Sequence, residues 1–274
     1  MGDEAAVSSR GPLAPLEKPI DLRRYPASSR AARLVRHYWI VEYRFPPGSS
    51  RDVPILVYPA CNVVIEPQRA RLYPPSPELE ERHLEGSGMA FGALLRPATG
   101  LRLAGRPIEE LAGASADLAD GAVAARVRDA MAGGADIASR HTAAIAAFES
   151  WLTARVPALG ADDELMNAVA DAVEGDAELT RVDELAARFG MGARRLERLT
   201  ARYLGLSPKW MIQRRRLQEA AARLGAEPAT ELSGLAAELG YADYPHFSRD
   251  FAATVGVTPR EFAAAAATVR RAPE

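Results

Sequence analysis

The sequence has a single cysteine, no long apolar run and no excess of positive charge. Cys61 is the only cysteine among 274 residues, which excludes an intrachain disulfide and a cysteine-rich zinc site. No apolar run reaches the roughly 18–20 residues that a membrane-spanning helix needs. The N-terminal residues also lack the apolar segment of a secretion signal. We therefore expect a cytoplasmic protein that does not enter the membrane.

Histidine is scarce as well, and its placement argues against a metal centre. The four histidines, at positions 37, 83, 141 and 246, are far apart and form none of the short pairs that metal sites use. Cys61 lies in an apolar strand-like run, where a thiol is usually buried and inert. We therefore expect no metal, no cofactor and no catalytic residue, and we expect that the protein is not an enzyme.

The net charge is −2, which does not by itself suggest a nucleic-acid partner. This average hides a local excess, because residues 188–223 hold ten basic and two acidic side chains, a net charge of +8. Phosphate binding depends on the local field rather than on the total charge. The segment is either a solvated helix face or a surface for a polyanion, and the repeated helical units around it favour the polyanion.

The N-terminal half has the sequence pattern of short β-strands. Residues 1–29 are rich in proline, serine and charge and lack a hydrophobic period, so we expect a flexible lead-in without a site. From about residue 34 to 103, short apolar runs are interrupted by Pro and Gly at a spacing that favours a small β-barrel or sandwich. Alternate residues from His37 to Tyr43 are predicted to share one face of a strand, and Pro74–Pro77 is expected to be a loop.

A small barrel can hold one ligand in its mouth. The candidate wall is aromatic and apolar, and a few polar side chains could orient a small molecule, although each of them also suits a structural or surface role. The residues that we assign to an effector site are Trp39, Tyr43, Tyr58, Asn62, Phe91 and Arg96.

Residues 107–157 turn helical, with glycines at 133 and 134 between two helices. In the second helix, Ile145, Phe148, Trp151 and Leu152 follow a helical spacing. Such a stripe is usually core, but a helix pair beside a ligand barrel also suits a homodimer contact. The Pro157–Ala161 segment is the predicted linker, so the expected domains are 30–157 and 161–274.

The stretch from Leu179 to Phe262 contains two copies of one unit, a short helix, a glycine turn and a second helix. Gly190 and Gly240 occupy the turns, and Leu-Ala-Ala precedes each of them. A turn of this kind sets the angle at which one helix braces another that inserts into DNA. The sequence therefore predicts two helix-turn-helix units.

The second helix of each unit carries the candidates for contact with double-stranded DNA. Its arginines cannot be buried unpaired, and arginine is the side chain that best reads guanine in the major groove. The long helix that starts at Ser207–Pro208 is predicted to hold the units apart and to touch phosphates. These candidates are Arg194, Arg195, Arg198, Arg202, Arg214, Arg215, Tyr244, His246 and Arg249.

Several short motifs follow one another in this region: LGLSP at 204–208, RLQEA at 216–220, LA at 235–236, GY at 240–241, HFSRDF at 246–251 and GVTPREF at 256–262. In order and spacing, they make residues 161–265 resemble the DNA-binding domain of the AraC/XylS family of bacterial transcription regulators. The resemblance implies seven helices, with two helix-turn-helix units joined by one linker helix and both recognition helices in successive major grooves.

By matching positions, the resemblance also implies which side chains reach base edges: Arg194, Glu197 and Arg198 in the first unit and Tyr244, Pro245, His246 and Arg249 in the second. Two positions depart from the family pattern. Gly192 replaces the Ser or Thr common at that helix cap, which weakens the helix start. Pro245 has no donor, so it would read a base by apolar contact.

The N-terminal runs PACNVVIE (59–66) and FGALLRPATG (91–100) resemble strands of the sensor domains fused to this family, which are often cupin-like barrels. We therefore expect an α+β protein, with a small cupin-like β-barrel and helices followed by an all-α seven-helix domain. The expected function is that of a DNA-binding transcription regulator controlled by a small hydrophobic or aromatic effector. Its partners would be DNA, a second copy of the chain and, for an activator, RNA polymerase.

Two other functions fit parts of the pattern. A ligand-independent adaptor would use the N-terminal half only for contacts. An enzyme fused to a DNA-binding domain, such as a DNA-alkylation repair protein, would need a cysteine-rich zinc site, against which the single cysteine argues.

Overall fold

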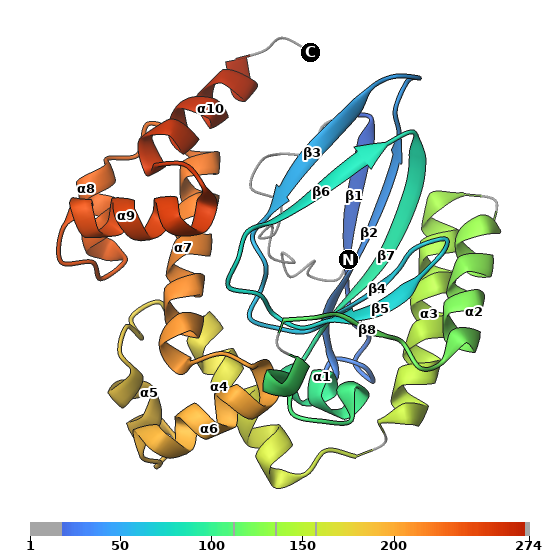
Figure 1. The fold of residues 1–274 in the computed structure, drawn as a ribbon, viewed down its shortest axis with the longest axis horizontal. Coiled ribbons are helices and arrows are strands. Elements are labelled where there is room, and N and C mark those ends of the chain that lie inside the picture. Colours follow the sequence, from blue (N-terminus) through green and yellow to red (C-terminus); the bar gives the residue numbers. More distant parts are fainter. Residues whose placement is uncertain (1–17, 112, 135, 157, 272–274) are drawn as a thin grey trace.

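The computed structural model describes residues 18–111, 113–134, 136–156 and 158–271. A part built on β-sheets is followed by a part built of helices (Figure 1), so the predicted α+β order is confirmed. Among the helices of these described residues, none has both the length and the apolar character needed to cross a membrane.

From residue 18 onward, the described N-terminal part contains two antiparallel sheets. The larger sheet has the strand order β1-β2-β7-β4-β5-β8, and β3 pairs with β6 in a separate two-stranded sheet. The strands are β1 (Ile20–Pro26), β2 (Val35–Arg44), β3 (Ser50–Ile55), β4 (Asn62–Ile65), β5 (Ala70–Tyr73), β6 (Glu80–Glu85), β7 (Ser87–Leu95) and β8 (Ala116–Asp117). Figure 1 shows β3 and β6 on the side of the larger sheet away from helices α2 and α3.

The N-terminal part is β-rich as expected, but its described sheets do not close into a barrel. Within the described strands, β1 and β8 lie at opposite edges of the larger sheet and do not pair with each other. The β8 strand has only two residues, which pair with Arg71 and Leu72 of β5. So short an edge cannot continue the ladder around to β1, and the sheet stays open.

The prediction of a lead-in over residues 1–29 is wrong for its last part. Residues 1–17 lie outside the described residues, but β1 pairs with β2 along its full length, from Ile20 opposite Tyr43 to Pro26 opposite His37. An edge strand can expose charged side chains such as Asp21 on its outer side. This charge concealed the strand from a search for apolar periodicity.

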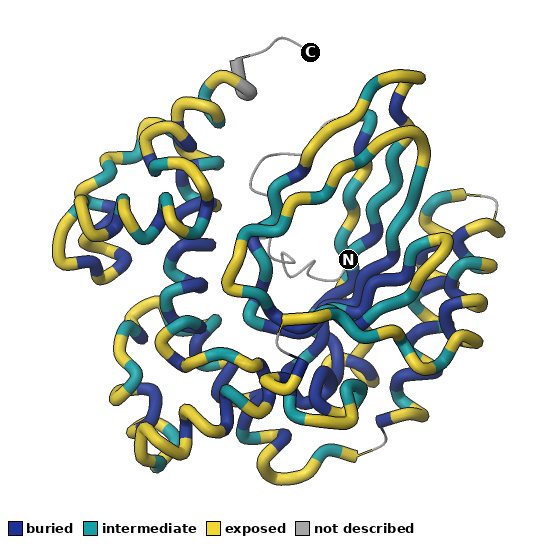
Figure 2. Tube along the Cα trace, in the orientation of Figure 1, coloured by how far each residue is buried: buried dark blue, intermediate teal, exposed yellow. Residues whose placement is uncertain are grey.

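Helices α2 (Gly121–Ala132) and α3 (Ile137–Arg155) cover one face of the larger sheet (Figure 1). Phe148 of α3 is fully buried, with its ring centroid 5.4 Å from that of Phe91 and 6.1 Å from that of Tyr38. The aromatic stripe of this helix is therefore core rather than a homodimer surface. The centre of the sheet is correspondingly the most buried part of the N-terminal half (Figure 2).

The described residues of the C-terminal part form seven helices: α4 (Ala161–Gly175), α5 (Val182–Arg188), α6 (Ala193–Leu204), α7 (Pro208–Ala226), α8 (Leu232–Glu238), α9 (Tyr244–Val255) and α10 (Pro259–Arg271). They enclose two hydrophobic cores. The long helix α7 joins these cores, because Met211 and Ile212 lie in the first and Leu217 and Leu224 in the second. This is the linker helix that the resemblance implied.

Helix α1 (Pro97–Ala104) and the 3₁₀ helix η1 (Ile108–Leu111) connect the two parts. Ala98 and Leu101 of α1 are buried in the first helical core, and Arg102 Nε donates to Asp163 Oδ2 of α4 at 3.1 Å. The N-terminal half thus supplies part of the core of the helical half. The predicted boundary at 157–161 stays a prediction, and Pro157 lies outside the described residues.

Candidate functional site

The first helical unit consists of α5, a turn and α6. Gly190 has φ +61°, a left-handed conformation that glycine adopts without strain. The turn is closed by the Met191 amide, which donates to the Ala186 carbonyl at 3.0 Å. Leu185 on α5 and Leu196 on α6 are both buried in the first helical core. This core fixes the inner face of α6 and turns the opposite face to solvent.

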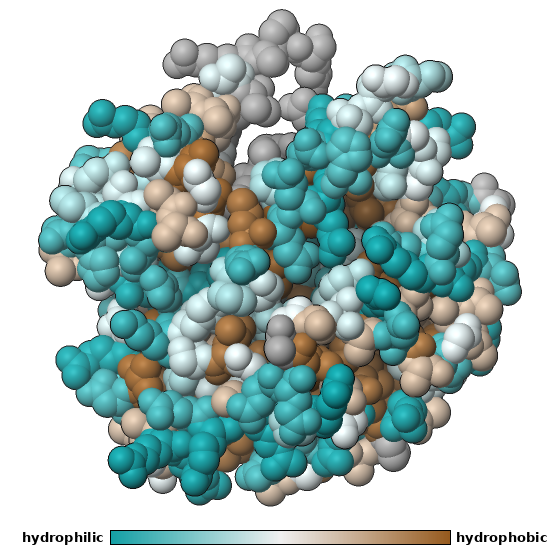
Figure 3. Space-filling view, viewed as in Figure 1, coloured by the Kyte–Doolittle hydropathy of each residue, from teal (hydrophilic) through white to brown (hydrophobic). Residues whose placement is uncertain are grey.

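The outer face of α6 carries all five predicted contact residues of the first unit. Every one of them is exposed: Arg194, Arg195, Glu197, Arg198 and Arg202. Hydrophilic side chains gather over the α5–α6 corner (Figure 3). Gly192 is the N-cap of α6 and makes no side-chain cap, as its lack of a side chain predicted.

The second unit repeats this geometry with α8, a turn and α9. Gly240 has φ +75°, and the Tyr241 amide donates to the Ala236 carbonyl at 2.9 Å, the counterpart of the bond in the first turn. Asp243 caps α9 as predicted, because its side chain accepts a hydrogen bond from the His246 amide at 2.7 Å. The two turns therefore place α6 and α9 in equivalent positions relative to their bracing helices.

The exposed end of α9 presents fewer cations than α6. Pro245, His246 and Arg249 are exposed, whereas Tyr244 is half-buried, with its ring 6.3 Å from that of Phe247. His246 Nε2 lies 3.6 Å from Asp250 Oδ2 in the next turn. This face combines an apolar surface, an imidazole and one guanidinium.

The structure contradicts the prediction that Arg214 and Arg215 contact phosphates. Their exposed fractions are 2% and 3%, because α7 passes between the two helical cores. Arg215 donates to the carbonyls of Ala177 and Leu179 at 3.0 and 3.3 Å, and Arg214 Nη2 donates to the Pro77 carbonyl at 2.6 Å. Both guanidiniums are thus bound inside the chain.

A pocket of about 370 Å³ lies between β2 and β7 of the larger sheet and the β3–β6 pair. Four of the six predicted effector residues line it: Trp39, Tyr43, Tyr58 and Asn62. Sequence reasoning missed the contributions of β1 and β3 and the apolar part of β6, among them Leu22, Arg24, Val53, Ile55 and Leu84. An alternation of apolar and charged residues marks these strands, but charge and Pro54 weaken the signal.

Two glycines of β7 make room for the aromatic side chains of the pocket. Trp39 lies opposite Gly92 and Tyr43 opposite Gly88 in the β2–β7 register. A Cβ atom on Gly92 would lie 1.8 Å from the Trp39 ring, so only glycine permits this ring position. Trp39 Nε1 donates to Asn62 Oδ1 at 3.2 Å, which fixes the indole within the pocket wall.

His37 is the buried titratable group of the pocket wall. Burial, together with the positive charges of Arg24 and Arg36, lowers the pKa of His37 from its ordinary 6.5 to about 4. The ring, which packs edge-on against Tyr58 with centroids 6.1 Å apart, is therefore neutral at pH 7. A neutral imidazole adds a polar contact to the pocket without adding charge.

Two predicted effector residues lie elsewhere. Phe91 is fully buried on the opposite face of the sheet, where it packs against Phe148, because its neighbours in β7 alternate between the two faces. Arg96 follows β7; its Nε donates to the Ala32 carbonyl at 3.1 Å, and its guanidinium pairs with Asp171 of α4. The effector assignments of Phe91 and Arg96 are therefore wrong.

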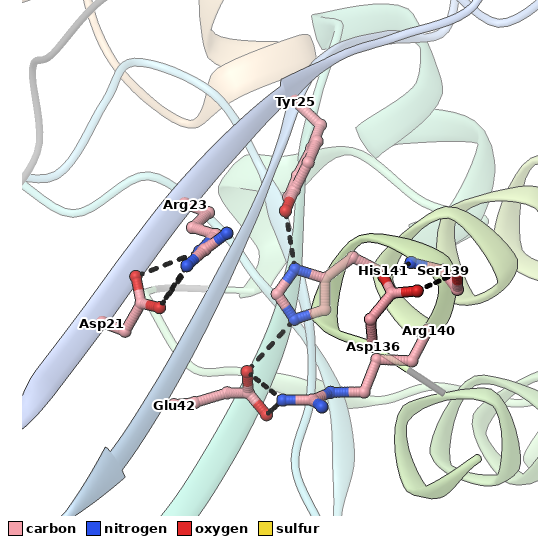
Figure 4. A network of polar contacts seen from close by, with 8 residues as sticks. All are labelled: Asp21, Arg23, Tyr25, Glu42, Asp136, Ser139, Arg140 and His141. Carbon is pink, nitrogen blue, oxygen red and sulfur yellow. Dashed lines mark hydrogen bonds and ion pairs between the residues drawn. The ribbon is translucent and has the colours of Figure 1, made fainter. Parts of the chain in front are cut away.

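A polar network joins α3 to the helix-covered face of the sheet (Figure 4). The Tyr25 hydroxyl lies 2.7 Å from His141 Nδ1, and His141 Nε2 lies 3.2 Å from Glu42 Oε2. Arg140 donates to both oxygens of Glu42 at 2.8 Å. His141 is 1% exposed, and burial lowers its pKa. The network thus holds α3 on β1 and β2, with His141 buried and Glu42 and Arg140 partly exposed.

No metal centre appears among the described residues, since none of their His, Cys, Asp and Glu side chains form a group of three able to hold an ion. Cys61 is fully buried, and burial raises the pKa of its thiol to about 12. The thiol is therefore protonated and inert at neutral pH, as its strand position predicted.

Two known families match parts of the chain. A helix-turn-helix domain matches residues 185–265, from α5 into α10. A domain of unknown function (DUF6597) matches residues 23–117, which span β1 to β8. Among curated proteins, none matches the chain.

The chain is also similar to solved structures of ToxT from Vibrio cholerae. ToxT from strain O395 is 12% identical, with 90% of this chain and 98% of that chain covered and a TM-score of 0.42. ToxT from strain SCE256 with a bound unsaturated fatty acid is 11% identical, with 89% and 94% covered and a TM-score of 0.38. Both TM-scores lie below 0.5, a level at which two structures agree only loosely.

The family match covers the whole linker helix and both helix-turn-helix units except the first three residues of α5. Its bounds agree with the motifs by which the sequence resembles the AraC/XylS family. The C-terminal half of this chain carries an AraC-type helix-turn-helix domain.

Proposed function

We propose that the protein is a sequence-specific DNA-binding transcription regulator that responds to a small molecule in its N-terminal pocket. The observation that carries this proposal is the pair of matched turns at Gly190 and Gly240. Each turn braces a helix whose outer face is exposed and bears arginine. Two such helices on one linker helix suit successive major grooves of DNA.

The first unit supplies charge-rich contacts. Arg198 and Arg194 project from the exposed face of α6, where a guanidinium can donate two hydrogen bonds to guanine O6 and N7. Glu197 lies on the same exposed side and can accept from the amino group of cytosine. Arg195 and Arg202 suit phosphates, which position the helix without reading sequence.

The second unit would contact the bases with fewer charged side chains. Arg249 is the exposed cation of α9, and His246 and Pro245 stand at the end of the helix that would enter the groove. Pro245 has no amide hydrogen, so its contact with a base is apolar, as with a thymine methyl. The two units thus combine strong electrostatic attachment with a more shape-dependent contact.

The pocket fits a small hydrophobic or aromatic effector. Its wall is formed by Trp39, Tyr43 and Tyr58 together with aliphatic side chains, and polar or charged groups such as Asn62 and Arg24 also line it. Concave, mostly apolar pockets with a few placed polar groups are the usual sites for small ligands. Binding would shift the population of conformations able to bind an operator.

Selection of bound sequences from a random pool of double-stranded DNA tests the DNA-binding part. We expect a site with two recognised segments about one helical turn apart. A tandem or inverted repetition of that site would indicate a homodimer, and its distance from a promoter would indicate contact with RNA polymerase. Recovery of unrelated sequences would contradict sequence-specific binding.

Thermal melting with a panel of small hydrophobic and aromatic compounds tests the effector part. A compound that binds the folded chain raises the melting temperature, and at a hundredfold excess over Kd the gain is about 2.7 kcal/mol. Trp39→Ala removes part of the pocket wall and should abolish the rise. A chain that responds to no compound would instead be a ligand-independent adaptor.

A further inference from the structure

The segment Pro74–Leu79 borders the pocket at both ends and contacts the linker helix in its middle. Tyr73 and Pro74 line the pocket at its start, and Glu80 lines it where β6 begins. Between them, the carbonyls of Ser76 and Pro77 accept hydrogen bonds from Arg214 Nη2 of α7, at 3.4 and 2.6 Å. The wall of the pocket and the contact with α7 are therefore one continuous piece of chain.

Arg214 depends on this segment for its hydrogen bonds. The side chain is 2% exposed, and its guanidinium carbon lies 4.7 Å from the centroid of the Trp210 ring. None of the ion pairs among the described residues includes Arg214, and its Nη1 has no hydrogen-bond partner there. Burial lowers the pKa of the guanidinium to about 10. Because an unpaired buried cation is strongly unfavourable, separation of the segment from α7 is costly.

Of the two arginines that follow, Arg215 binds the segment that leads into the first helix-turn-helix unit, and Arg216 binds the turn of the second unit. Consecutive side chains of a helix point about 100° apart. Arg215 donates to the carbonyls of Ala177 and Leu179, which lie between α4 and α5. Arg216 donates to the Leu239 carbonyl in the turn of the second unit, and its guanidinium carbon lies 3.8 Å from the centroid of the Tyr241 ring. Three adjacent arginines thus hold three different parts of the molecule.

Prolines make this segment stiff. Three of its residues are prolines, whose rings fix φ. Its far end also approaches the second unit, because a Cβ atom on Gly256, at the end of α9, would lie 3.7 Å from Leu79 Cδ2. A displacement at the pocket end of the segment is therefore passed to α7 and to the end of α9.

We propose that Arg214 is the positioning residue through which occupancy of the pocket acts on the DNA-binding helices. A molecule that displaces Pro74 or Glu80 shifts the carbonyls of Ser76 and Pro77, and α7 follows through Arg214. Arg215 and Arg216 then carry both helix-turn-helix units along with α7. This inference rests on the proposed function, since it names the route by which the effector site would control operator binding.

The contact itself is tested without any ligand or DNA, by amide hydrogen exchange in the full chain. Arg214→Met should speed exchange by about tenfold at the Glu78 amide, which donates to Ser76 Oγ at 3.1 Å, whereas the matched variant Arg216→Met should leave this amide unchanged. Arg214→Lys, which keeps a buried cation but has fewer donors, should lie between the two. Unchanged exchange in the folded Arg214→Met and Arg214→Lys chains would overturn the proposal.

The coupling is tested with a substitution that fills the pocket. Ala90 lines the pocket opposite Val41, so Ala90→Leu places additional volume there in every molecule. Ala90→Leu should change the Kd for the selected operator about fivefold or more in the chain with Arg214. The change should fall below about twofold when Arg214→Lys is also present and persist with Arg30→Lys, since Arg30 is exposed and lies outside the proposed route.

Each outcome of this second experiment is decisive. A change of equal size with and without Arg214→Lys would overturn the role of Arg214, and so would the absence of any change in the chain with Arg214. Failure of the unsubstituted chain to bind any selected DNA would contradict the proposed function itself. In that case the exchange experiment still shows whether Arg214 holds the segment.

Discussion

At the scale of single residues, arginines that are close in sequence take opposite roles. Arg198 on α6 is exposed, whereas Arg215 on α7 is 3% exposed and bound to main-chain carbonyls. The difference comes from the face of the helix on which each side chain lies, and from how many faces of that helix are covered. The exposed arginines are therefore the ones to test for DNA contact.

Arg198→Ala and Arg249→Ala should each weaken binding to the selected operator by about 1–3 kcal/mol and relax the base preference at one position. The reason is the loss of hydrogen bonds to a base edge. Competition binding against operators with single base changes measures both effects. Arg30→Ala, an exposed arginine of the N-terminal part, is the matched control and should change neither. Unaltered discrimination in both test variants would remove these residues from base reading.

His37 gives the fold a dependence on pH. Its pKa in the folded chain is about 4, below the ordinary 6.5, because burial and two nearby arginines oppose protonation. The neutral ring therefore stabilises the fold fully above pH 6.5, and this contribution is lost as the pH falls toward 4. The loss amounts to about 3 kcal/mol.

Urea unfolding between pH 4 and 7 measures this loss. His37→Gln should flatten the pH dependence of the free energy of unfolding relative to the unsubstituted chain. His83→Gln provides the control, because His83 is exposed on β6 and its pKa is raised by a hydrogen bond with Asp52. Identical pH profiles for the His37→Gln and unsubstituted chains would contradict the effect.

At the scale of elements, the two helix-turn-helix turns depend on glycines in the left-handed region. Gly190→Ala should lower the free energy of unfolding by about 1 kcal/mol, because φ is +61° there while a Cβ atom would meet no other atom. The cost is one of backbone conformation alone. Gly175→Ala is the control, since Gly175 lies in α4 without a positive φ and also has open space around it. A Gly190→Ala chain as stable as the control would show that the turn tolerates other residues.

Linker helix α7 shows why an element's surroundings matter more than its composition. Its three adjacent arginines form the densest positive run in the sequence, and on an isolated helix they would face solvent. In the fold, cores on both sides and the Pro74–Leu79 segment cover the helix, so that carbonyl oxygens replace water around the guanidiniums.

At the scale of the whole molecule, the basic surface is smaller than the sequence indicated. Of ten basic residues between 188 and 223, six are exposed, namely Arg188, Arg194, Arg195, Arg198, Arg202 and Lys209. The remaining four are partly or fully buried. The number of phosphate contacts should follow the exposed set, because only exposed cations release counterions from DNA.

Salt dependence of DNA binding tests this count. Arg195→Ala and Arg202→Ala should each reduce the slope of log Kobs against log salt by about 1 and weaken binding to all sequences alike. Arg215→Lys, which keeps a cation inside the fold, should leave the slope unchanged. A smaller slope for Arg215→Lys would mean that Arg215 reaches phosphate after all.

The sequence alone determined the helical half in detail. Caps, glycine turns and apolar spacing at Ser207, Asp243, Gly190 and Gly240 are local signals, and each of them acts within a few residues of the chain. They predicted the two units, the linker helix and the exposed face of α6. The alternation around Trp39 likewise predicted that Trp39 and Tyr43 share one face of their strand, and both of them line the pocket.

Only the tertiary structure decided which face of each element is covered, because covering elements come from distant parts of the chain. The open sheet, the strand at 20–26 and the contribution of α1 to the helical core depend on pairing and packing across the molecule. The same holds for Phe91, which lies on the core face of its strand, and for Arg214, which meets a segment more than a hundred residues earlier in sequence. A sequence pattern fixes the direction of a side chain along its own element, but the neighbour that it meets is set by the fold.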